Sequence, residues 1–482
     1  MEKMTFVLIL SALLISSCAQ KSINNDDKIT QVENNLVGAI QPAGEHPANI
    51  KDRMLYFHIH GLSIAVIQNY HILWAKGYGW ADVNKKLPVT TSTLFQAASI
   101  SKSLNGVGLL KLVQEKKLDL YADINTYLTG WKFPYDSLSK GKKISVANLL
   151  SHTGGLTVHG FPGYELGKDR PTVEQILDGK TPSNSPAVRS MYEPGLRSEY
   201  SGGGITISQL ILTNITHQPY DEYMKKEVLQ PMGMESSTYA QPPNNIQPNL
   251  LATAYDQNGE EITGKYHIYP EQAAAGLWTN PTDLAKYIIE TQLAYEGKSS
   301  KVLDQQTTRL RLTPYLDNNA ALGVFIDKSD STAYFQHGGA NEGFRCQYYG
   351  SLTKGNGVVV MVNSNNGNIM SEIINSVAKV YDFKGLYRSK TSIAVADSVL
   401  EKYTGQYALT PTFILVITKE GNQLYTQATN QPKFKIYAET PTKFTPVEFP
   451  AEIEFIKDAN GKINSATLYQ NGQQHEAKRI SP

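Results

Sequence analysis

The stretch Phe95-Gln-Ala-Ala-Ser99-Ile-Ser-Lys102 is where the sequence joins a strand-like segment to an apolar run. Beyond it, residues such as Leu104, Val107 and Leu110 recur at helical spacing. The pattern predicts a helix over residues 95–113 with one buried face. Ser99 and Lys102 are three residues apart, so they should face the same side of its first turn.

This pairing of serine and lysine indicates nucleophilic catalysis. Burial disfavours a charged amine, so the pKa of Lys102 should be lowered. A neutral Lys102 amine can then take the hydroxyl proton of Ser99. The helix N-terminus supplies a backbone N–H and a favourable dipole for a developing oxyanion. We therefore predict that Ser99 attacks a carbonyl carbon, with Lys102 as base, and forms an acyl-enzyme.

The spacing Ser-x-x-Lys is not specific by itself, because it also begins at Ser137, Ser139, Ser351 and Ser376. The first two serines lie in a lysine-rich polar loop, and the third precedes a turn. The fourth lies on a late helix whose lysine should point to water. Only Ser99 combines a strand-like approach with an apolar helix.

Strand patterns lie on both sides of this segment. Residues 62–67 and 72–78 predict a hairpin upstream. Downstream, strands are predicted over 322–326, 334–336, 344–349 and 357–362, and helices from Pro281 and over 370–381. Because strands at both ends enclose helices, we predict an α+β domain over 36–384. It would contain one antiparallel sheet built from both ends of the domain, with a helical insert.

The C-terminal part has a different pattern. A polar linker over 385–399 is followed by short alternating runs over 400–482. Turn pairs such as Asn460-Gly461 and Asn471-Gly472 separate these runs. They predict a small antiparallel β-barrel.

The N-terminus has the features of an export signal. Lys3 precedes an apolar run over 6–15, which is too short to span a bilayer. Ile15-Ser-Ser-Cys18 is similar to a bacterial lipobox, which predicts a lipoprotein signal peptide over 1–18 and lipidation of Cys18. Residues 19–35 would form a tether. We expect a periplasmic or outer-membrane lipoprotein of a bacterium, attached to the membrane only through this lipid; a simple secretory signal is the alternative.

Composition excludes several classes of function. The 482 residues carry 45 basic and 44 acidic side chains, a net charge of +1 that gives no electrostatic basis for binding nucleic acid. A small molecule or a peptide is the expected substrate. With Cys18 lipidated, Cys346 has no disulfide partner. His58-Ile59-His60 is interpreted as a polar pair at a strand start, and no spacing predicts a metal site or a cofactor.

Several motifs together resemble the serine β-lactamase and penicillin-binding protein superfamily. The similarity is strongest to the branch of class C β-lactamases, D-Ala-D-Ala carboxypeptidases, D-aminopeptidases and β-lactamase-like esterases, and it covers roughly Leu55 to Tyr381. The motifs occur in the expected order: Phe95 to Lys102, Leu149 to Leu156, Glu193 to Ser201, Ala275 to Leu284 and His337 to Gly343.

The resemblance assigns roles to further residues. Tyr200 would be a partner base, with its phenolate stabilised by the Lys102 ammonium. His337, Gly338 and Gly339 stand where the family has Lys-Thr-Gly, so His337 would contact the substrate carboxylate or the Tyr200 hydroxyl.

Two backbone groups would stabilise the oxyanion. The resemblance implies that the N–H of Ala340, with that of Ser99, forms the oxyanion hole. His152 is expected to brace its loop rather than act as a base.

One departure from the family concerns substrate choice. Gly202 follows Tyr200-Ser201 where most relatives have asparagine, the residue that holds the substrate's acyl amide. Its absence moves the expectation slightly away from a β-lactamase, leaving an esterase, a D-amino-acid peptidase or carboxypeptidase, or a β-lactamase as alternatives.

Two readings other than catalysis in the α+β domain remain open. One is a non-catalytic or slowly acylating protein that binds penicillin or peptidoglycan fragments, or acts as a sensor. The other gives the main function to the C-terminal barrel, which resembles the small lipocalin-like domains appended to such hydrolases.

Overall fold

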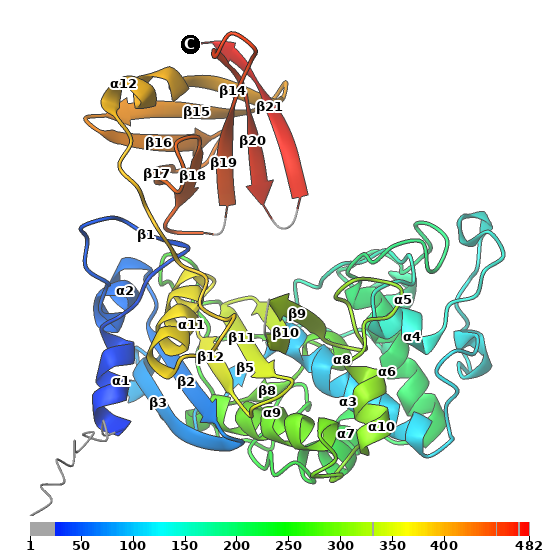
Figure 1. Cartoon of the computed structure of the whole chain (residues 1–482). Coiled ribbons are helices and arrows are strands. Elements are labelled where there is room, and N and C mark those ends of the chain that lie inside the picture. The colour runs from blue at the N-terminus through cyan, green and yellow to red at the C-terminus, as the bar shows by residue number, and fades with distance from the viewer. Residues whose placement is uncertain (1–24, 330–331, 450, 471–472, 482) are drawn as a thin grey trace, which may run out of the picture.

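The computed structural model describes residues 25–329, 332–449, 451–470 and 473–481. An α+β domain forms the larger part, and a closed β-barrel stands above one side of it (Figure 1). The predicted fold class is therefore confirmed for both parts.

A seven-stranded antiparallel sheet forms the centre of the α+β domain. Its strands, in spatial order, are β4 (Leu87–Pro88), β3 (His71–Asp82), β2 (Gly61–Gln68), β12 (Gly357–Val362), β11 (Phe344–Ser351), β10 (Thr332–Asn341) and β9 (Phe325–Ser329). The N-terminal strand β2 pairs with the C-terminal strand β12, with Leu62 opposite Val362. The sheet is thus built from both ends of the domain, as predicted.

Strict alternation along the central strands explains why both faces of the sheet are covered. Leu62, Ile64 and Val66 pack into one hydrophobic cluster, whereas Ala65 and Ile67 pack into another. The first cluster lies under α1 (Asn25–Glu33), α2 (Ile50–Tyr56) and α11 (Asn368–Tyr381). The second lies under α9 (Pro281–Tyr295) and the helical insert.

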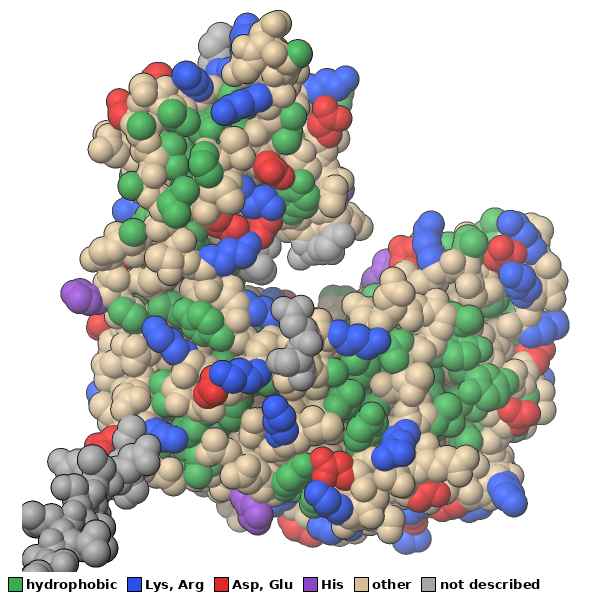
Figure 2. All heavy atoms as spheres, viewed as in Figure 1, with side chains coloured by type: hydrophobic (Ala, Val, Ile, Leu, Met, Phe, Trp, Pro, Cys, Tyr) green, Lys and Arg blue, Asp and Glu red, His purple; other side chains and the backbone are tan. Residues whose placement is uncertain are grey.

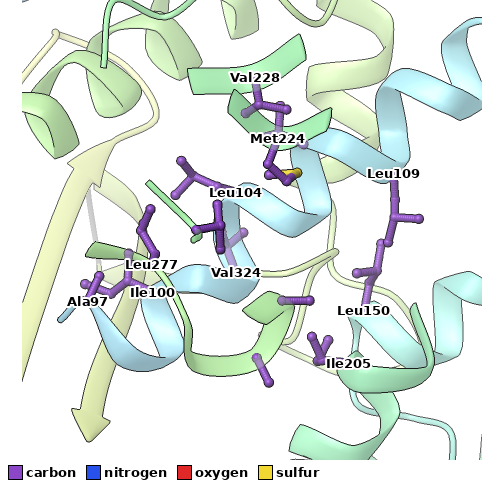
Figure 3. Packing of buried hydrophobic residues seen from close by; sticks show 14 of the residues in the cluster. Ala97, Ile100, Leu104, Leu109, Leu150, Ile205, Met224, Val228, Leu277 and Val324 are labelled. Carbon is purple, nitrogen blue, oxygen red and sulfur yellow. The ribbon is translucent and has the colours of Figure 1, made fainter. Parts of the chain in front are cut away.

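The insert packs around α3 (Ser101–Gln114), whose side chains are buried along most of its length. Figure 3 shows Leu104 and Leu109 of α3 among side chains from neighbouring segments. The other helices of this region are α4 (Val146–Leu150), α5 (Val173–Asp178), α6 (Gly202–Thr216), α7 (Tyr220–Met224), α8 (Gln272–Ala275) and α10 (Gln305–Arg311). Two short ladders join β5 (Phe95–Gln96) to β8 (Trp278–Thr279), and β6 (Tyr164–Glu165) to β7 (His267–Ile268).

The helix predicted over 95–113 begins later than the sequence indicates. Phe95 and Gln96 pair with β8, and the next turn is a 3-10 helix over Ala98–Ile100. Ala98 has a φ of 48°, in the left-handed region, which breaks helical continuity before Ser99. Ser99 therefore lies just before α3, and Lys102 lies in its first turn.

A second correction concerns the strand predicted over 322–326. The strand β9 instead covers Phe325–Ser329. Gly323 donates its N–H to Leu150 O at 2.9 Å, and Ala321 donates to Val324 O at 2.9 Å. The bond between Ala321 and Val324 closes a turn over residues 321–324, and the bond to Leu150 attaches this turn to the end of α4.

Part of the predicted tether belongs to the folded domain. Residues 25–33 form α1, whose Val32 is fully buried and accepts a hydrogen bond on its carbonyl oxygen from Ser376 Oγ at 2.7 Å. Val32 and the partly buried Ile29 pack into the cluster under α11 and anchor this otherwise polar helix. Cys18 and the predicted signal peptide lie outside the described residues. No described helix has the length and apolar character needed to cross a membrane.

Eight consecutive antiparallel strands close the C-terminal barrel. They are β14 (Gly405–Thr410), β15 (Phe413–Glu420), β16 (Gln423–Ala428), β17 (Lys433–Ala438), β18 (Lys443–Pro446), β19 (Ala451–Lys457), β20 (Ile463–Gln470) and β21 (Gln473–Ser481). The first strand pairs with the last, with Tyr407 opposite Arg479. Tyr403 stacks on Phe455 with ring centroids 4.4 Å apart, which fills one end of the interior.

The linker attaches the barrel to the α+β domain. Within it, β13 (Lys390–Thr391) forms a parallel pair with β1 (Ile40–Gln41), and the short helix α12 (Asp397–Leu400) follows. Ile393 donates its N–H to Ala438 O at 2.8 Å. A Cβ on Gly38 would lie 2.4 Å from Val447 O, so the two parts are in close contact.

Candidate active site

Ser99 and Lys102 lie together, as the sequence predicts. Lys102 Nζ donates to Ser99 Oγ at 2.9 Å and to Ala274 O of α8 at 2.6 Å. The lysine side chain is buried, and no carboxylate pairs with it among the described residues. Desolvation lowers the pKa of Lys102 to about 7. A substantial fraction of neutral amine is therefore available near neutral pH to take the Ser99 proton.

Tyr200 approaches the same pair from the loop before α6. Lys102 Nζ lies 5.0 Å from the centroid of the Tyr200 ring. Burial raises the pKa of Tyr200, and a hydrogen bond with the Ser99 side chain opposes this shift only in part. The expectation of a Tyr200 phenolate stabilised by the Lys102 ammonium is therefore wrong for the free protein. Tyr200 is a neutral phenol, able to donate and accept a proton.

His337 lies on β10, and its ring is directed towards the same site. It is buried, with its ring centroid 6.2 Å from that of Tyr200 and 5.4 Å from that of Phe325. Its Nδ1 lies 2.6 Å from Gly338 O, and Nε2 has no partner among the described residues. Burial and the nearby Lys102 charge lower the pKa of His337 to about 3. A neutral imidazole can contact the Tyr200 hydroxyl or a substrate, but it supplies no positive charge for a carboxylate.

His152 and Phe325 complete an aromatic cluster behind the site. The His152 ring lies 4.3 Å from the Tyr200 ring, and Phe325 stacks on His152 at 6.0 Å. The N–H of Ser201 donates to Nδ1 of His152 at 3.2 Å. His152 thus fixes the backbone next to Tyr200, in line with its predicted bracing role. Sequence reasoning missed Phe325, which no motif marks.

The edge of β10 that carries Ala340 is open. β9 pairs with β10 only as far as Gln336, opposite Phe325, and no other strand in the described part of the chain pairs with residues 337–341 on that side. An unpaired strand edge presents backbone N–H groups, since alternate residues of an antiparallel ladder point away from the partner strand. The oxyanion hole of Ser99 and Ala340 stays a prediction that fits this arrangement.

Gly339 brings β10 against the segment before Ser99. A Cβ at this position would lie 2.3 Å from Ala97 O and 2.4 Å from Cys346 Sγ. Cys346 Sγ itself donates to Ala97 O at 3.0 Å. Only glycine permits this approach, which sets the distance between the nucleophile and the predicted oxyanion hole.

Replacing Gly339 by alanine is therefore expected to separate β10 from Ser99. The free energy of unfolding should fall by about 1–3 kcal/mol, and kcat/KM for an activated ester by about 100-fold, the usual cost of a displacement near 1 Å. Thermal unfolding and ester hydrolysis measure the two effects. Gly338→Ala is the control for stability, because the one close contact of its Cβ, at 2.7 Å, is with Oε1 at the end of the flexible Gln347 side chain. Equal melting temperatures for the two variants would contradict the close contact.

Gly202 is the first residue of α6, and the ring of Phe161 lies next to it. A Cβ on Gly202 would lie 3.0 Å from the Phe161 ring and 3.3 Å from His159 O. His159 Nδ1 lies 2.5 Å from Tyr200 O, which holds this loop in place. A side chain at position 202 would therefore require the Phe161 ring to move by a few tenths of an ångström.

No group of metal ligands occurs in the described part of the chain: no three His, Cys, Asp or Glu side chains converge in a suitable arrangement.

Comparison with known proteins agrees with this geometry. Residues 48–378 match the family described as Beta-lactamase. The chain belongs to the beta-lactamase family. Residues 389–479 match a second family, described as Domain of unknown function (DUF3471), which corresponds to the barrel.

Individual relatives of this beta-lactamase family member are distant. Protein flp of Staphylococcus aureus (strain N315) is 26% identical over 322 residues, covering 64% of this chain and 60% of that protein. The chain thus spans about 60% of the length of the first curated relatives. Penicillin-binding protein 4* of Bacillus subtilis (strain 168) is 22% identical over 437 residues, covering 85% of this chain and 92% of that protein.

A solved structure confirms the fold over most of the chain. The octameric penicillin-binding protein homologue from Pyrococcus abyssi superposes with a TM-score of 0.58 at 21% identity. The match covers 89% of this chain and 98% of that one.

Proposed function

We propose that this protein is an exported serine hydrolase that cleaves an ester or an amide through an acyl-enzyme on Ser99. The observation that carries the proposal is the buried Lys102 amine, 2.9 Å from Ser99 Oγ and with a pKa of about 7. Such a pair is suited to nucleophilic attack near neutral pH. A serine in contact with a buried lysine amine of lowered pKa disfavours the alternative of a non-catalytic binding protein.

In the acylation step, Ser99 Oγ attacks the substrate carbonyl carbon while its proton passes to Lys102 Nζ. The negative charge on the carbonyl oxygen is stabilised by the N–H groups of Ser99 and Ala340. The bond to the leaving group then breaks, and the proton moves from Lys102 through the Tyr200 hydroxyl to that group. Water then attacks the carbonyl carbon of the acyl-enzyme while Lys102 takes one of its protons. The ester bond to Ser99 Oγ breaks, the acid is released, and Lys102 returns the proton to Ser99.

The surroundings of Ser99 favour an acyl group without charge. Tyr200, Phe325 and a neutral His337 form one wall, and the Phe161 ring occupies the space next to Gly202. An uncharged wall offers little to a carboxylate or an acyl amide. We therefore propose that esters, or amides with uncharged acyl groups, are better substrates than penicillins.

Export belongs to the proposal as well. The lipobox-like Ile15-Ser-Ser-Cys18 supports removal of the first 17 residues and lipidation of Cys18. The enzyme would then act in the periplasm or at the outer membrane, attached through its lipid.

Mass spectrometry of the intact protein tests the catalytic proposal. The wild type and Ser99→Ala are incubated separately with a fluorophosphonate, a penicillin and a short-chain activated ester. We expect a fluorophosphonate adduct and ester turnover in the wild type only, with slower or no acylation by penicillin. The same behaviour of both proteins, with no adduct in either, would contradict the proposal. Faster acylation by penicillin than by the ester would contradict the substrate preference alone.

A further inference from the structure

The barrel interior is not filled at the end that faces the α+β domain. At the other end, the rings of Tyr403, Tyr407 and Phe455 pack together. At the open end a cavity of about 90 Å³ is lined mainly by apolar side chains, among them Phe413, Leu415, Phe434, Ile453 and Leu468. An eight-stranded barrel has an interior wide enough either to be filled by side chains or to hold one small ligand.

One polar group inside this cavity lacks a partner. Thr426 lines it, is 6% exposed, and its Oγ1 has no hydrogen-bond partner among the described residues. Buried hydroxyl groups in proteins are normally hydrogen-bonded, because an unpaired one costs free energy. A ligand that reaches into the barrel can supply the missing partner.

A larger cavity continues from the barrel towards the sheet. It measures about 740 Å³ and shares Phe449, Ala451 and Gln470 with the barrel cavity. Its floor includes Gln347 of β11 and Ile374 of α11. Figure 2 shows the hollow between the barrel and the α+β domain. Volumes of 300–1,000 Å³ are typical of binding sites for small molecules.

The charges around the larger cavity are already balanced. Lys390 Nζ is 2.6 Å from Glu439 and 2.8 Å from Glu452. Lys443 Nζ lies 3.0 Å from Glu452, and Arg388 pairs with Asp327. Apart from these groups, the polar lining is rich in amides, namely those of Gln347, Asn375, Gln470, Gln473 and Gln474. Such a lining favours a neutral head group with several hydrogen-bonding atoms, since a charged one would have to displace existing ion pairs.

From this arrangement we propose that the barrel and the α+β domain together form a second binding site, for an uncharged amphipathic molecule. Its apolar tail enters the barrel beside Thr426, and its neutral polar head lies among the glutamines between the two parts. The site is separate from Ser99, so binding does not depend on the proposed hydrolase activity.

Fluorescence titration of the full chain with the neutral dye N-phenyl-1-naphthylamine tests the site. We expect saturable binding that is unchanged in Ser99→Ala. Octyl glucoside, below its micelle concentration, should displace the dye. Nonanoate, which has the same eight-carbon alkyl tail but a charged head, should displace it at least tenfold less effectively. Absence of saturable dye binding would overturn the proposal, and equal competition by the two ligands would overturn the neutral head group.

Two alanines on the barrel provide a matched pair of variants. Ala428 lines the cavity, so Ala428→Phe should fill it and weaken dye binding at least tenfold. Ala408 lies between Tyr407 and Leu409, which pack into the barrel core, so its side chain is on the outer face. Ala408→Phe should bind the dye like the wild type.

A second variant keeps the test valid if Ala428→Phe does not fold. Phe434 lies at the rim, its ring 5.0 Å from that of Phe449, and is only partly buried. Phe434→Ser should also weaken binding at least tenfold while the melting transition of the barrel is kept. Wild-type affinity in a folded Ala428→Phe or Phe434→Ser would place the dye elsewhere and overturn the proposal.

Discussion

Replacing Lys102 by methionine is expected to lower kcat/KM for ester hydrolysis by about 10³-fold, within the range that a general base contributes. Methionine keeps most of the apolar contacts of the lysine side chain but removes the amine that lies 2.9 Å from Ser99 Oγ. Among the described residues, the side chain that remains within hydrogen-bonding distance of the Ser99 hydroxyl is then the neutral phenol of Tyr200, which is a poor base. Steady-state kinetics with an activated ester measures the loss.

The pH dependence of the wild type provides a second readout of the same group. Lys102 acts as base only when it is neutral, and its pKa is about 7. The value of kcat/KM, which reports the free enzyme, should therefore fall tenfold per pH unit below about pH 7. Lys102→Met should lose this acidic limb. An acidic limb that persists in the variant would assign the ionisation to another group.

Stability distinguishes loss of the base from damage to the fold. The pKa of Lys102 is lower in the folded protein than the usual value of 10.5, so the unfolded chain binds more protons between these two values. Burial of the Lys102 amine therefore lowers the free energy of unfolding most below about pH 7, and this destabilisation decreases as the pH rises. Lys102→Met removes it, so the variant should melt at or above the wild-type temperature at pH 6. A lower melting temperature would indicate that the lost activity reflects misfolding.

Local sequence was sufficient to predict the Ser99 and Lys102 pair because the two residues are three positions apart. Their contact needs only one turn of chain and an apolar helix that buries the amine. The left-handed Ala98 that precedes them was not predictable, since it depends on the pairing of β5 with β8 and on the approach of Gly339.

Tyr200 and His337 required the resemblance to a family, because each is separated from Ser99 by a hundred residues or more. Even then, the predicted charge of Tyr200 was wrong, because burial by neighbouring elements raises the pKa of its hydroxyl. Phe325 and Phe161 were missed for a related reason. Phe325 lies in a segment predicted as a strand and Phe161 lies in a loop, but the pattern of neither segment shows which distant residue the ring contacts.

The N-terminal helix illustrates the same limit on a larger scale. The composition of residues 25–33 is that of a solvated tether, with only Ile29 and Val32 packing against the core. Its position depends on α11, more than 300 residues later, whose Ser376 bonds to it. The barrel, by contrast, is built from neighbouring strands and short turns, so its existence followed from local pattern alone.

Removal of the Tyr200 hydroxyl should separate two steps of catalysis. Tyr200→Phe is expected to lower kcat for an alkyl ester by about 100-fold, typical for loss of a proton donor. The loss for a p-nitrophenyl ester should be at least tenfold smaller, because that leaving group departs without protonation. The reason is the state of Tyr200 in the structure: burial raises its pKa, so it holds its proton and lies beside Ser99 to pass one on.

A matched tyrosine serves as the control. Tyr192 is partly buried and its hydroxyl donates to Glu199 at 3.3 Å, away from Ser99, so Tyr192→Phe should keep wild-type rates for both esters. Equal losses for the two esters in Tyr200→Phe would contradict a role in protonating the leaving group. They would place Tyr200 instead with His152 and Phe325, as a ring that only positions the site. The ratio of the two losses therefore decides between proton transfer and packing, which a single rate measurement does not.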